Sequence, residues 1–313
     1  MTPDPILSVK GLTAYFGPFA AVRNVSFDLF SRKTLAIVGE SGSGKTTLAL
    51  TLVGAHSGKF TGEILYRSLP HKIETLRGSK ITMVFQDPSG ALNPVYTIGW
   101  QLLEAIQLHT SLDEEASWRL AIESLKEVQL EPAEMIFEKY PHELSGGQKQ
   151  RAMIAMAMVV KPDILIADEP TTALDVTLQM EIIELIRKLQ REHHMALLLI
   201  THDMGVMAEL ADEVIVMYAG SAVERGTREE ILNRPLHPYT QALVQASFLE
   251  AGPDGRLKAI AGSVPSIGEL PRGCPFHPRC PFAWDKCTQS PPPDYTSRKV
   301  KCFLYESSEG PKP

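Results

Sequence analysis

Hydrophobic and polar residues alternate in the first part of the chain, from Ile6 to Phe16 and from Ala21 to Leu29. An alternation of period two that is rich in β-favouring residues predicts half-buried antiparallel strands. Shorter apolar segments predict further strands at Leu35–Val38, Glu63–Tyr66 and Ile81–Phe85. The first quarter of the chain is therefore expected to be mostly strands.

The period of the apolar positions changes after the sequence Gln86-Asp-Pro. Two sets of apolar residues then recur at helical spacing: Ile98, Leu102 and Ile106, followed by Trp118, Ile122, Leu125 and Val128. This spacing places each set on one helical face. We therefore expect a helical insertion from about Pro88 to Val160. In its final segment, Ser145 is placed to cap a buried helix that includes Ala152–Val160.

Strands and helices alternate after the insertion. Strands are predicted at Ile164–Ala167 and Leu197–Ile200, and a helix between them carries Ile182, Ile186 and Leu189 on one face. Such alternation predicts a largely parallel sheet covered on both faces. Ligands of these sheets bind at the carboxyl ends of the strands. Four polar or glycine positions each follow a predicted strand and are expected to share one site: Gly39, Gln86, Asp168 and His202.

The last part of the chain changes in composition. Closing strands are predicted at Val214–Tyr218 and Ala222–Glu224, and short helices at Arg228–Leu232 and Thr240–Ala246. Proline and glycine then become frequent, and Ser247–Gly273 is predicted to be a loosely structured linker.

The segment from Gly39 to Thr47 fits the phosphate-loop motif G-x-x-x-x-G-K-[ST]. It lies between a predicted strand and a predicted helix, Leu48–Val53, which is the setting that the motif requires. Its glycines allow backbone N–H groups to surround a phosphate at a helix N-terminus. Lys45 would bind the β- and γ-phosphates, and the Thr46 hydroxyl would bind Mg²⁺. The expected nucleotide-binding residues of the loop are Gly39, Ser41, Gly42, Ser43, Gly44, Lys45, Thr46 and Thr47.

Composition is that of a soluble globular protein. The 313 residues are 44% hydrophobic and 22% charged, with a formal net charge of -6. This charge gives no overall attraction for nucleic acid. No apolar run approaches the length that spans a bilayer, and the N-terminus lacks the pattern of a secretory signal. We therefore expect a cytosolic chain that reaches a membrane only through partners.

All four cysteines lie within the last forty residues: Cys274, Cys280, Cys287 and Cys302. In a reducing cytosol such a cluster favours a metal or iron-sulfur site over disulfides. The spacing C-x5-C-x6-C-x14-C lacks the C-x2-C pair of common zinc sites and does not match the ferredoxin patterns. Free thiols, zinc and an iron-sulfur cluster therefore all remain open from the spacing alone.

The sequence Leu144-Ser-Gly-Gly-Gln, together with the phosphate loop, resembles the nucleotide-binding subunits of ATP-binding cassette (ABC) transporters. The resemblance extends from Ile6 to about Ala246. It implies an α/β fold, the ABC-type P-loop NTPase, with a RecA-like mostly parallel sheet, an antiparallel β subdomain and a helical subdomain. The implied domains are a core of residues 1–87 and 161–233, a helical signature subdomain of 88–160, and a small cysteine-containing C-terminal extension of 234–313.

The resemblance also implies a role for each motif in binding and hydrolysing ATP with Mg²⁺. Asp168 would hold Mg²⁺ together with Thr46, and Glu169 would act as the base that polarises the attacking water. Gln86 would be a catalytic residue that contacts Mg²⁺ or the attacking water and senses the membrane partner. His202 would donate a hydrogen bond to the γ-phosphate. The aromatic ring that stacks on adenine would be Phe16, with Tyr15 as the alternative.

The signature segment implies a dimer. In this family Ser145 and Gly147 contact ATP that is held by a second subunit, and Asp175 communicates between the two sites. The residues expected at this second nucleotide are Ser145, Gly146, Gly147, Gln148 and Asp175.

Three further segments resemble the ATPase subunits of oligopeptide and dipeptide importers, a group that includes nickel and some oligosaccharide importers. They begin at Phe85 (FQDPSGALNP), Arg234 (RPLHPYT) and Gly273 (GCPFHPRCP). The resemblance implies a peripheral ATPase on the cytoplasmic face of the cell membrane. Its partners would be a second, homologous and commonly different ATPase subunit, two membrane permease subunits and an extracytoplasmic substrate-binding protein.

Members of this importer group carry a [4Fe-4S] cluster in the tail. By resemblance we expect the four cysteines to ligate such a cluster, with zinc as the alternative and with a structural role.

Two other classes of protein fit the sequence less well. Non-transport ABC ATPases of DNA repair or translation resemble a cassette split by a long coiled coil or carry two cassettes, whereas this chain has one uninterrupted cassette and no basic arm. An iron-sulfur redox enzyme would leave the complete set of ATPase motifs without a purpose.

Overall fold

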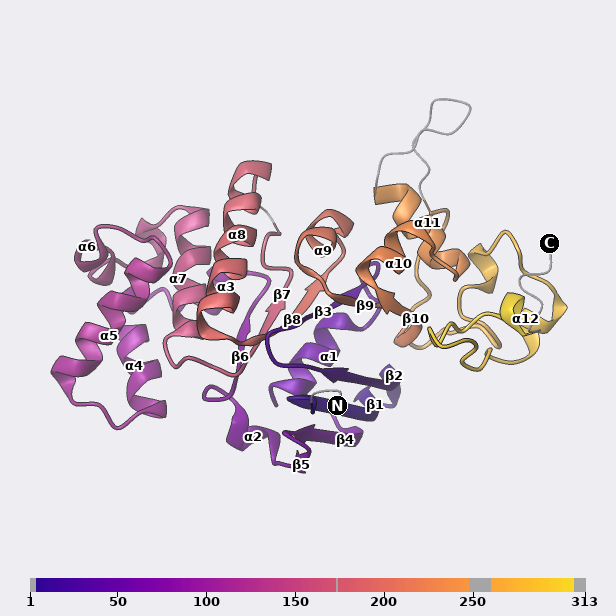
Figure 1. Cartoon of the computed structure of the whole chain (residues 1–313), viewed down its shortest axis with the longest axis horizontal. Helices are drawn as coiled ribbons and strands as arrows, with labels where there is room; N and C mark the ends of the chain where they lie inside the picture. Colours follow the sequence, from indigo (N-terminus) through magenta and orange to yellow (C-terminus); the bar gives the residue numbers. More distant parts are fainter. Residues whose placement is uncertain (1–3, 173, 248–259, 307–313) are drawn as a thin grey trace. The chain divides into compact units, whose positions relative to one another are not determined.

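The computed structural model describes residues 4–172, 174–247 and 260–306 (Figure 1). The chain forms two compact units. One contains Phe30–Lys33 and His71–Leu198, and the other contains Thr2–Leu29, Thr34–Pro70 and Leu199–Pro313. The phosphate loop and the cysteines belong to the second of these units, and the signature segment belongs to the first.

A four-stranded antiparallel sheet lies in the unit that carries the phosphate loop. Its order is β2-β1-β4-β5. The strands are β1 (Leu7–Phe16), β2 (Phe19–Leu29), β4 (Phe60–Tyr66) and β5 (Leu69–Pro70). Buried Val9 and Leu12 flank exposed Lys10, so the alternation in the sequence separates a core face from solvent. The expected antiparallel strands are confirmed, although β2 begins at Phe19 rather than at Ala21.

A second sheet has six strands in the order β10-β9-β3-β8-β7-β6. The strands are β3 (Thr34–Val38), β6 (Ile81–Val84), β7 (Ile164–Asp168), β8 (Ala196–Thr201), β9 (Glu213–Tyr218) and β10 (Ser221–Thr227). Strand β3 pairs in parallel with β9, and β6 pairs in parallel with β7, whereas β10 runs antiparallel to β9. Every residue of β3, β7 and β8 is buried. The expected, largely parallel and doubly covered sheet is confirmed.

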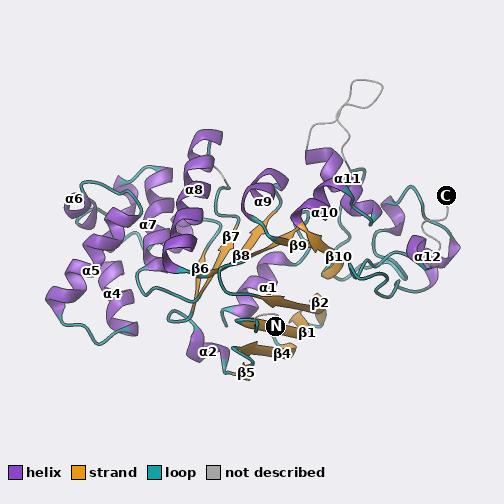
Figure 2. Cartoon of the chain, in the orientation of Figure 1, coloured by secondary structure: helices purple, strands orange, loops and turns teal. Residues whose placement is uncertain are grey.

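The predicted insertion is helical in the structure. The helices of this unit are α2 (Ile73–Leu76), α3 (Pro88–Ala91), α4 (Ile98–His109), α5 (Glu114–Glu127), α6 (Ala133–Phe137), η1 (Pro141–Glu143), α7 (Gly146–Met158) and α8 (Val176–His193). Helices α4 to α7 gather into one group (Figure 2). Trp118, which the helical period placed on the buried face, is 43% exposed in the structure. Its ring meets that of Phe137 edge-on, with ring centroids 6.4 Å apart.

The helices of the other unit are short. They are α1 (Lys45–Leu52), α9 (Met204–Leu210), α10 (Arg228–Asn233), α11 (Pro238–Ser247), η2 (His277–Arg279), α12 (Asp285–Gln289) and η3 (Phe303–Tyr305). Of the predicted linker Ser247–Gly273, residues 248–259 lie outside the described residues. Ser247 is the last residue of α11, whereas residues 260–273 contain neither helix nor strand.

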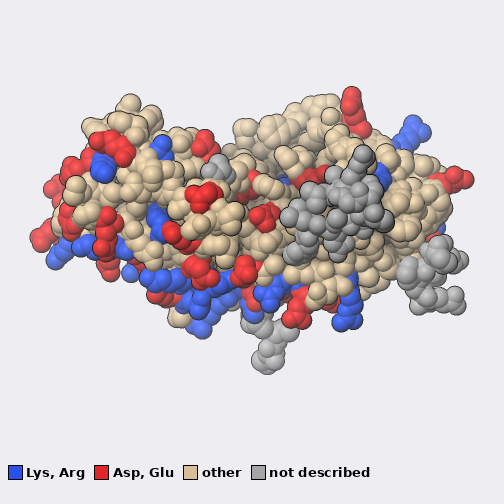
Figure 3. All heavy atoms as spheres, turned by 90° about the horizontal axis from the view of Figure 1, so that it is seen from above, with Lys and Arg blue, Asp and Glu red and all other residues tan. Residues whose placement is uncertain are grey.

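Charged side chains of both signs share the face shown in Figure 3, where Lys and Arg lie beside Asp and Glu. This mixture agrees with the slightly acidic composition of the chain, with a net charge of -6.

Candidate functional site

The phosphate loop connects β3 to α1 and contains two positions, Gly39 and Gly44, that only glycine can occupy. Gly44 caps α1 with a φ of 95°. A Cβ atom there would lie 2.5 Å from the carbonyl oxygen of Ala21, and a Cβ at Gly39 would lie 2.2 Å from that of Met217. Real Cβ contacts are never so short, so the loop packs its main chain directly against two neighbouring segments. This packing restricts the backbone of the loop.

Polar side chains of the loop are divided between buried and exposed positions. Lys45 is 5% exposed, and its Nζ donates hydrogen bonds to the carbonyl oxygens of Gly39 (2.8 Å) and Glu40 (3.0 Å). Among the described residues, none hydrogen-bonds the buried hydroxyl of Ser43. Ser41 and Thr46 are exposed, so their hydroxyls are accessible to a ligand. This donor set at a helix N-terminus suits a phosphate with a bound cation.

Phe16 and His202 belong to the same unit as the loop. Phe16 ends β1 and is 54% exposed, with the His56 ring 5.3 Å away in an edge-on arrangement. Tyr15 is half-buried. Phe16 therefore offers the more accessible ring face for stacking. His202 follows β8 and is exposed.

The structure brings Gln86 and Glu169 together in the other unit. Gln86 Nε2 donates to Glu169 Oε2 over 2.8 Å, and Thr172 Oγ1 donates to the same oxygen over 2.9 Å. Glu169 has a φ of 46°, a left-handed conformation that is strained for a residue with a side chain. Asp168 ends β7 and is 1% exposed. Two donors therefore fix the orientation of the Glu169 carboxylate.

The signature segment forms the N-terminus of α7. Ser145 is the N-cap: its Oγ accepts from Gln148 N (3.3 Å), and Gln148 Oε1 accepts from Ser145 N (3.0 Å). This capping box occupies the Gln148 side chain, while Ser145 and Gly146 remain exposed. Gly147 is buried, and a Cβ there would lie at an ordinary contact distance of 3.4 Å from the Leu178 side chain.

Asp175 lies at the start of α8. Its Oδ1 accepts hydrogen bonds from the backbone N–H groups of Thr177 (3.1 Å) and Leu178 (3.0 Å). The structure therefore gives Asp175 a helix-capping role, and its side chain is exposed at the surface.

Sequence reasoning missed the contacts that surround Glu40. Arg279 forms two hydrogen bonds with the Glu40 carboxylate, and the hydroxyl of Tyr239 accepts from Glu40 N over 2.8 Å. The phosphate-loop motif leaves the residue at this position unspecified. Because Arg279 lies 239 residues further along the chain, no spacing signal connects the two. The hydrogen bond from Thr172 to Glu169 was missed as well.

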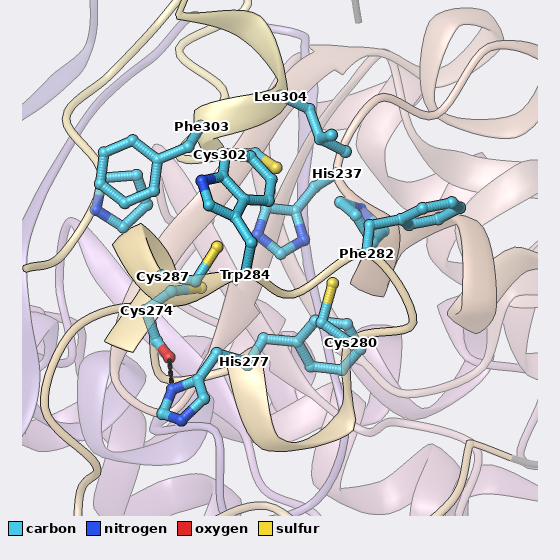
Figure 4. A pocket seen from close by; sticks show the side chains of 13 residues that line it. His237, Cys274, His277, Cys280, Phe282, Trp284, Cys287, Cys302, Phe303 and Leu304 are labelled. Carbon is cyan, nitrogen blue, oxygen red and sulfur yellow. Dashed lines mark hydrogen bonds between the residues drawn. The ribbon is translucent and has the colours of Figure 1, made fainter. Parts of the chain in front are cut away.

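All four cysteines line a single narrow pocket, together with the aromatic side chains of Phe276, Phe282, Trp284 and Phe303 (Figure 4). The Cys274 N–H donates to the Cys287 carbonyl oxygen (2.8 Å), and His277 Nδ1 lies 2.9 Å from the Cys274 carbonyl oxygen. Burial raises the pKa of Cys274 to about 11 and that of Cys302 to about 12.

The described part of the chain contains no group of three or more His, Cys, Asp or Glu side chains arranged to hold a single metal ion. Nor does any helix within the described ranges have the length and apolar character needed to cross a membrane.

Known proteins are similar to this chain over nearly its whole length. The ABC transporter family profile matches residues 22–172, and that of the oligopeptide/dipeptide transporter C-terminal region matches 223–287. The dipeptide transport ATP-binding protein DppD of Haemophilus influenzae is 43% identical over 97% of each chain. The oligopeptide transport ATP-binding protein AppD of Bacillus subtilis is 43% identical over 96% of this chain and 97% of its own.

Solved structures share the fold. A dimeric structure of MJ0796, a bacterial ABC transporter cassette, has a TM-score of 0.63 and 28% identity, and the match covers 71% of this chain and 98% of that one.

The close approach of main chain to Gly44 gives a test of the loop. We expect Gly44→Ala to weaken the binding of MgADP more than Gly42→Ala, as measured by calorimetric titration. Both glycines have positive φ, 95° and 79°, so each alanine carries a backbone cost of about 1–2 kcal/mol. Only at Gly44 would the new Cβ also collide with a main-chain oxygen, since nothing lies within 4 Å of a Cβ at Gly42. Equal effects of the two variants would contradict the assigned loop geometry.

Proposed function

Because the chain belongs to the ABC transporter family, among the ATP-binding proteins of oligopeptide and dipeptide transport, we propose that it powers the uptake of di- and oligopeptides by hydrolysing ATP. The observation that carries this proposal is the 43% identity that extends over 97% of both this chain and the Haemophilus influenzae relative. The match of residues 223–287 to the oligopeptide/dipeptide transporter C-terminal region supports peptides as the cargo. Nickel or oligosaccharides are the alternative cargo, and a non-transport ABC ATPase is the alternative function.

The phosphate loop binds ATP in this proposal. Lys45 contacts the β- and γ-phosphates, and the accessible Thr46 hydroxyl holds Mg²⁺ with Asp168 and Gln86. Phe16 stacks on the adenine, which its 54% exposed ring supports. The close main-chain packing at Gly39 and Gly44 supports a preformed cradle, because a restricted loop loses less freedom when phosphate binds.

Glu169 accepts the proton of the attacking water as general base. Two local observations support this role of Glu169. Hydrogen bonds from Gln86 and Thr172 orient one carboxylate oxygen, and the strained backbone sets the direction of the side chain. Strain of this kind gathers at functional sites. His202 donates a hydrogen bond to the γ-phosphate as negative charge shifts toward it in the transition state.

Two such subunits enclose two ATP molecules, each bound by the loop of one subunit and the signature segment of the other. Exposed Ser145 and Gly146 at the N-terminus of α7 support this role, because that helix end presents N–H groups to an anion. Gly147, Gln148 and Asp175 complete the segment. The partner is a homologous ATPase, commonly a different chain. ATP stabilises the closed pair, and hydrolysis releases it.

The output of this cycle is movement of two membrane permease subunits that dock near Gln86 and the helical insertion. The ATPase is peripheral on the cytoplasmic face, and an extracytoplasmic binding protein selects the peptide. We propose that the chain has three domains: a nucleotide-binding core of residues 1–87 and 161–233, the helical signature subdomain of 88–160, and the extension of 234–313.

The four cysteines hold a [4Fe-4S] cluster in this proposal, with a structural role. Four thiol ligands of suitable type line one pocket, which supports it. Tetrahedral zinc bound by the same thiolates is the alternative.

Replacing Glu169 by Gln tests the hydrolytic role. We expect the rate of phosphate release from MgATP to fall at least about 100-fold, since general base catalysis typically contributes that much. ATP should still bind, and the closed dimer should persist by light scattering. Glu184→Gln, on an exposed position of α8, is the matched control and should hydrolyse ATP normally. Undiminished hydrolysis by the Glu169 variant would rule out its role as base.

Metal analysis after anaerobic purification tests the cluster. We expect a brown protein with about four irons per chain and less iron in Cys302→Ser, because each thiolate ligates one iron. Circular dichroism and MgADP binding report whether the Cys302 variant still folds. A colourless preparation with one zinc per chain, or with no metal, would contradict the cluster.

A further inference from the structure

The cysteine-containing extension makes a direct ion pair with the phosphate loop. Arg279 Nη1 donates to Glu40 Oε2 over 2.8 Å, and Nη2 donates to Oε1 over 2.9 Å. The Arg279 side chain is 5% exposed and that of Glu40 is 27% exposed. Two parallel charge-assisted hydrogen bonds of this kind fix both the position and the plane of the carboxylate.

The remaining donors of Arg279 hold the guanidinium in place. Nε donates to the Ala261 carbonyl oxygen over 2.7 Å, and Nη1 also lies 3.3 Å from the Tyr218 hydroxyl. On the loop side, the Glu40 N–H donates to the hydroxyl of Tyr239 over 2.8 Å, and burial raises the pKa of Tyr239 above its usual value. Glu40 is therefore anchored through both its side chain and its main chain.

Arg279 is positioned by the cysteine segment itself. It ends the short η2 turn between Cys274 and Cys280, where the N–H of His277 donates to the Cys274 carbonyl oxygen over 3.0 Å. Phe276, at the start of this turn, is 2% exposed and packs on the rings of Tyr218 and Tyr239, with centroids 5.3 and 5.4 Å away. The conformation around the cysteines therefore determines where Arg279 lies.

A carboxylate inside a phosphate loop opposes the binding of a phosphate, because like charges repel at short range. The paired charge of Arg279 offsets this penalty by neutralising Glu40. We propose that Arg279 is a positioning residue for nucleotide binding, which couples the cysteine-bearing extension to the phosphate loop through Glu40. This inference rests on the proposed function, since it requires that the loop bind a nucleotide.

The test measures calorimetric binding of MgADP to the full-length chain, because ADP occupies the loop without hydrolysis. We expect Arg279→Ala to weaken binding about tenfold, as is usual when a hydrogen-bonded charge loses its partner. Arg279→Lys should weaken MgADP binding less than Arg279→Ala does, since lysine keeps the positive charge but not the two parallel hydrogen bonds. In a Glu40→Gln background, Arg279→Ala should have a smaller effect, because no carboxylate remains to be neutralised.

Arg298→Lys is the matched control. Arg298 also ties the extension to the core, through an ion pair with buried Glu224, and it donates a further hydrogen bond to the Arg234 carbonyl oxygen (2.7 Å). Among the described residues it makes no contact with Glu40. It should lower thermal stability without changing the affinity for MgADP. The inference is overturned if both Arg279 variants bind like the wild type, or if Arg298→Lys weakens binding as much as Arg279→Lys. Wild-type protein that binds no MgADP would instead overturn the proposed function.

Discussion

Main-chain packing around the phosphate loop is the constraint on which the proposed activity depends. Carbonyl oxygens of Ala21 and Met217 approach Gly44 and Gly39 so closely that a side chain at either position would collide. This packing restricts the backbone of the loop, which lowers the cost of ordering it when phosphate binds. Lys45 is held in the same way, by hydrogen bonds to carbonyl oxygens of the loop itself.

The contact between the C-terminal extension and this loop links the extension to nucleotide binding. A metal cluster held by the four cysteines, as proposed, would explain how a segment rich in proline and glycine keeps a defined shape without a large core. The ion pair between Arg279 and Glu40 explains why that shape would matter for ATP. Stability of the extension and nucleotide affinity are then linked through one guanidinium group, so a change at the cysteines can alter the phosphate loop without touching the nucleotide.

Local patterns in the sequence predicted most elements, because each was specified by nearby residues. Alternating residues predicted β1, the phosphate-loop motif predicted the turn into α1, and Ser145 predicted the start of α7. Contacts between elements that are distant in the sequence could not be predicted from these local patterns. The helical period placed Trp118 on a buried face, yet the neighbouring helices leave it 43% exposed.

The pairing of Arg279 with Glu40 joins residues 239 positions apart. Glu40 stands at an unspecified position of the phosphate-loop motif, and the segment GCPFHPRCP that contains Arg279 does not indicate its partner. The cysteine spacing likewise left free thiols, zinc and a cluster open, and only the three-dimensional arrangement showed that all four side chains line one pocket. The roles of Glu169, His202 and the signature residues stay predictions that come from family resemblance and chemistry.

Transport by the purified complex tests the central claim most directly. The intact complex, isolated from native membranes and reconstituted into lipid vesicles, should accumulate labelled di- or oligopeptide only when MgATP is supplied on the side of this subunit. Substituting Lys45→Ala in this chain should abolish that accumulation, because the phosphates lose their principal cation. ATP-dependent accumulation of nickel or an oligosaccharide without peptide, or peptide uptake that does not require ATP, would contradict the account.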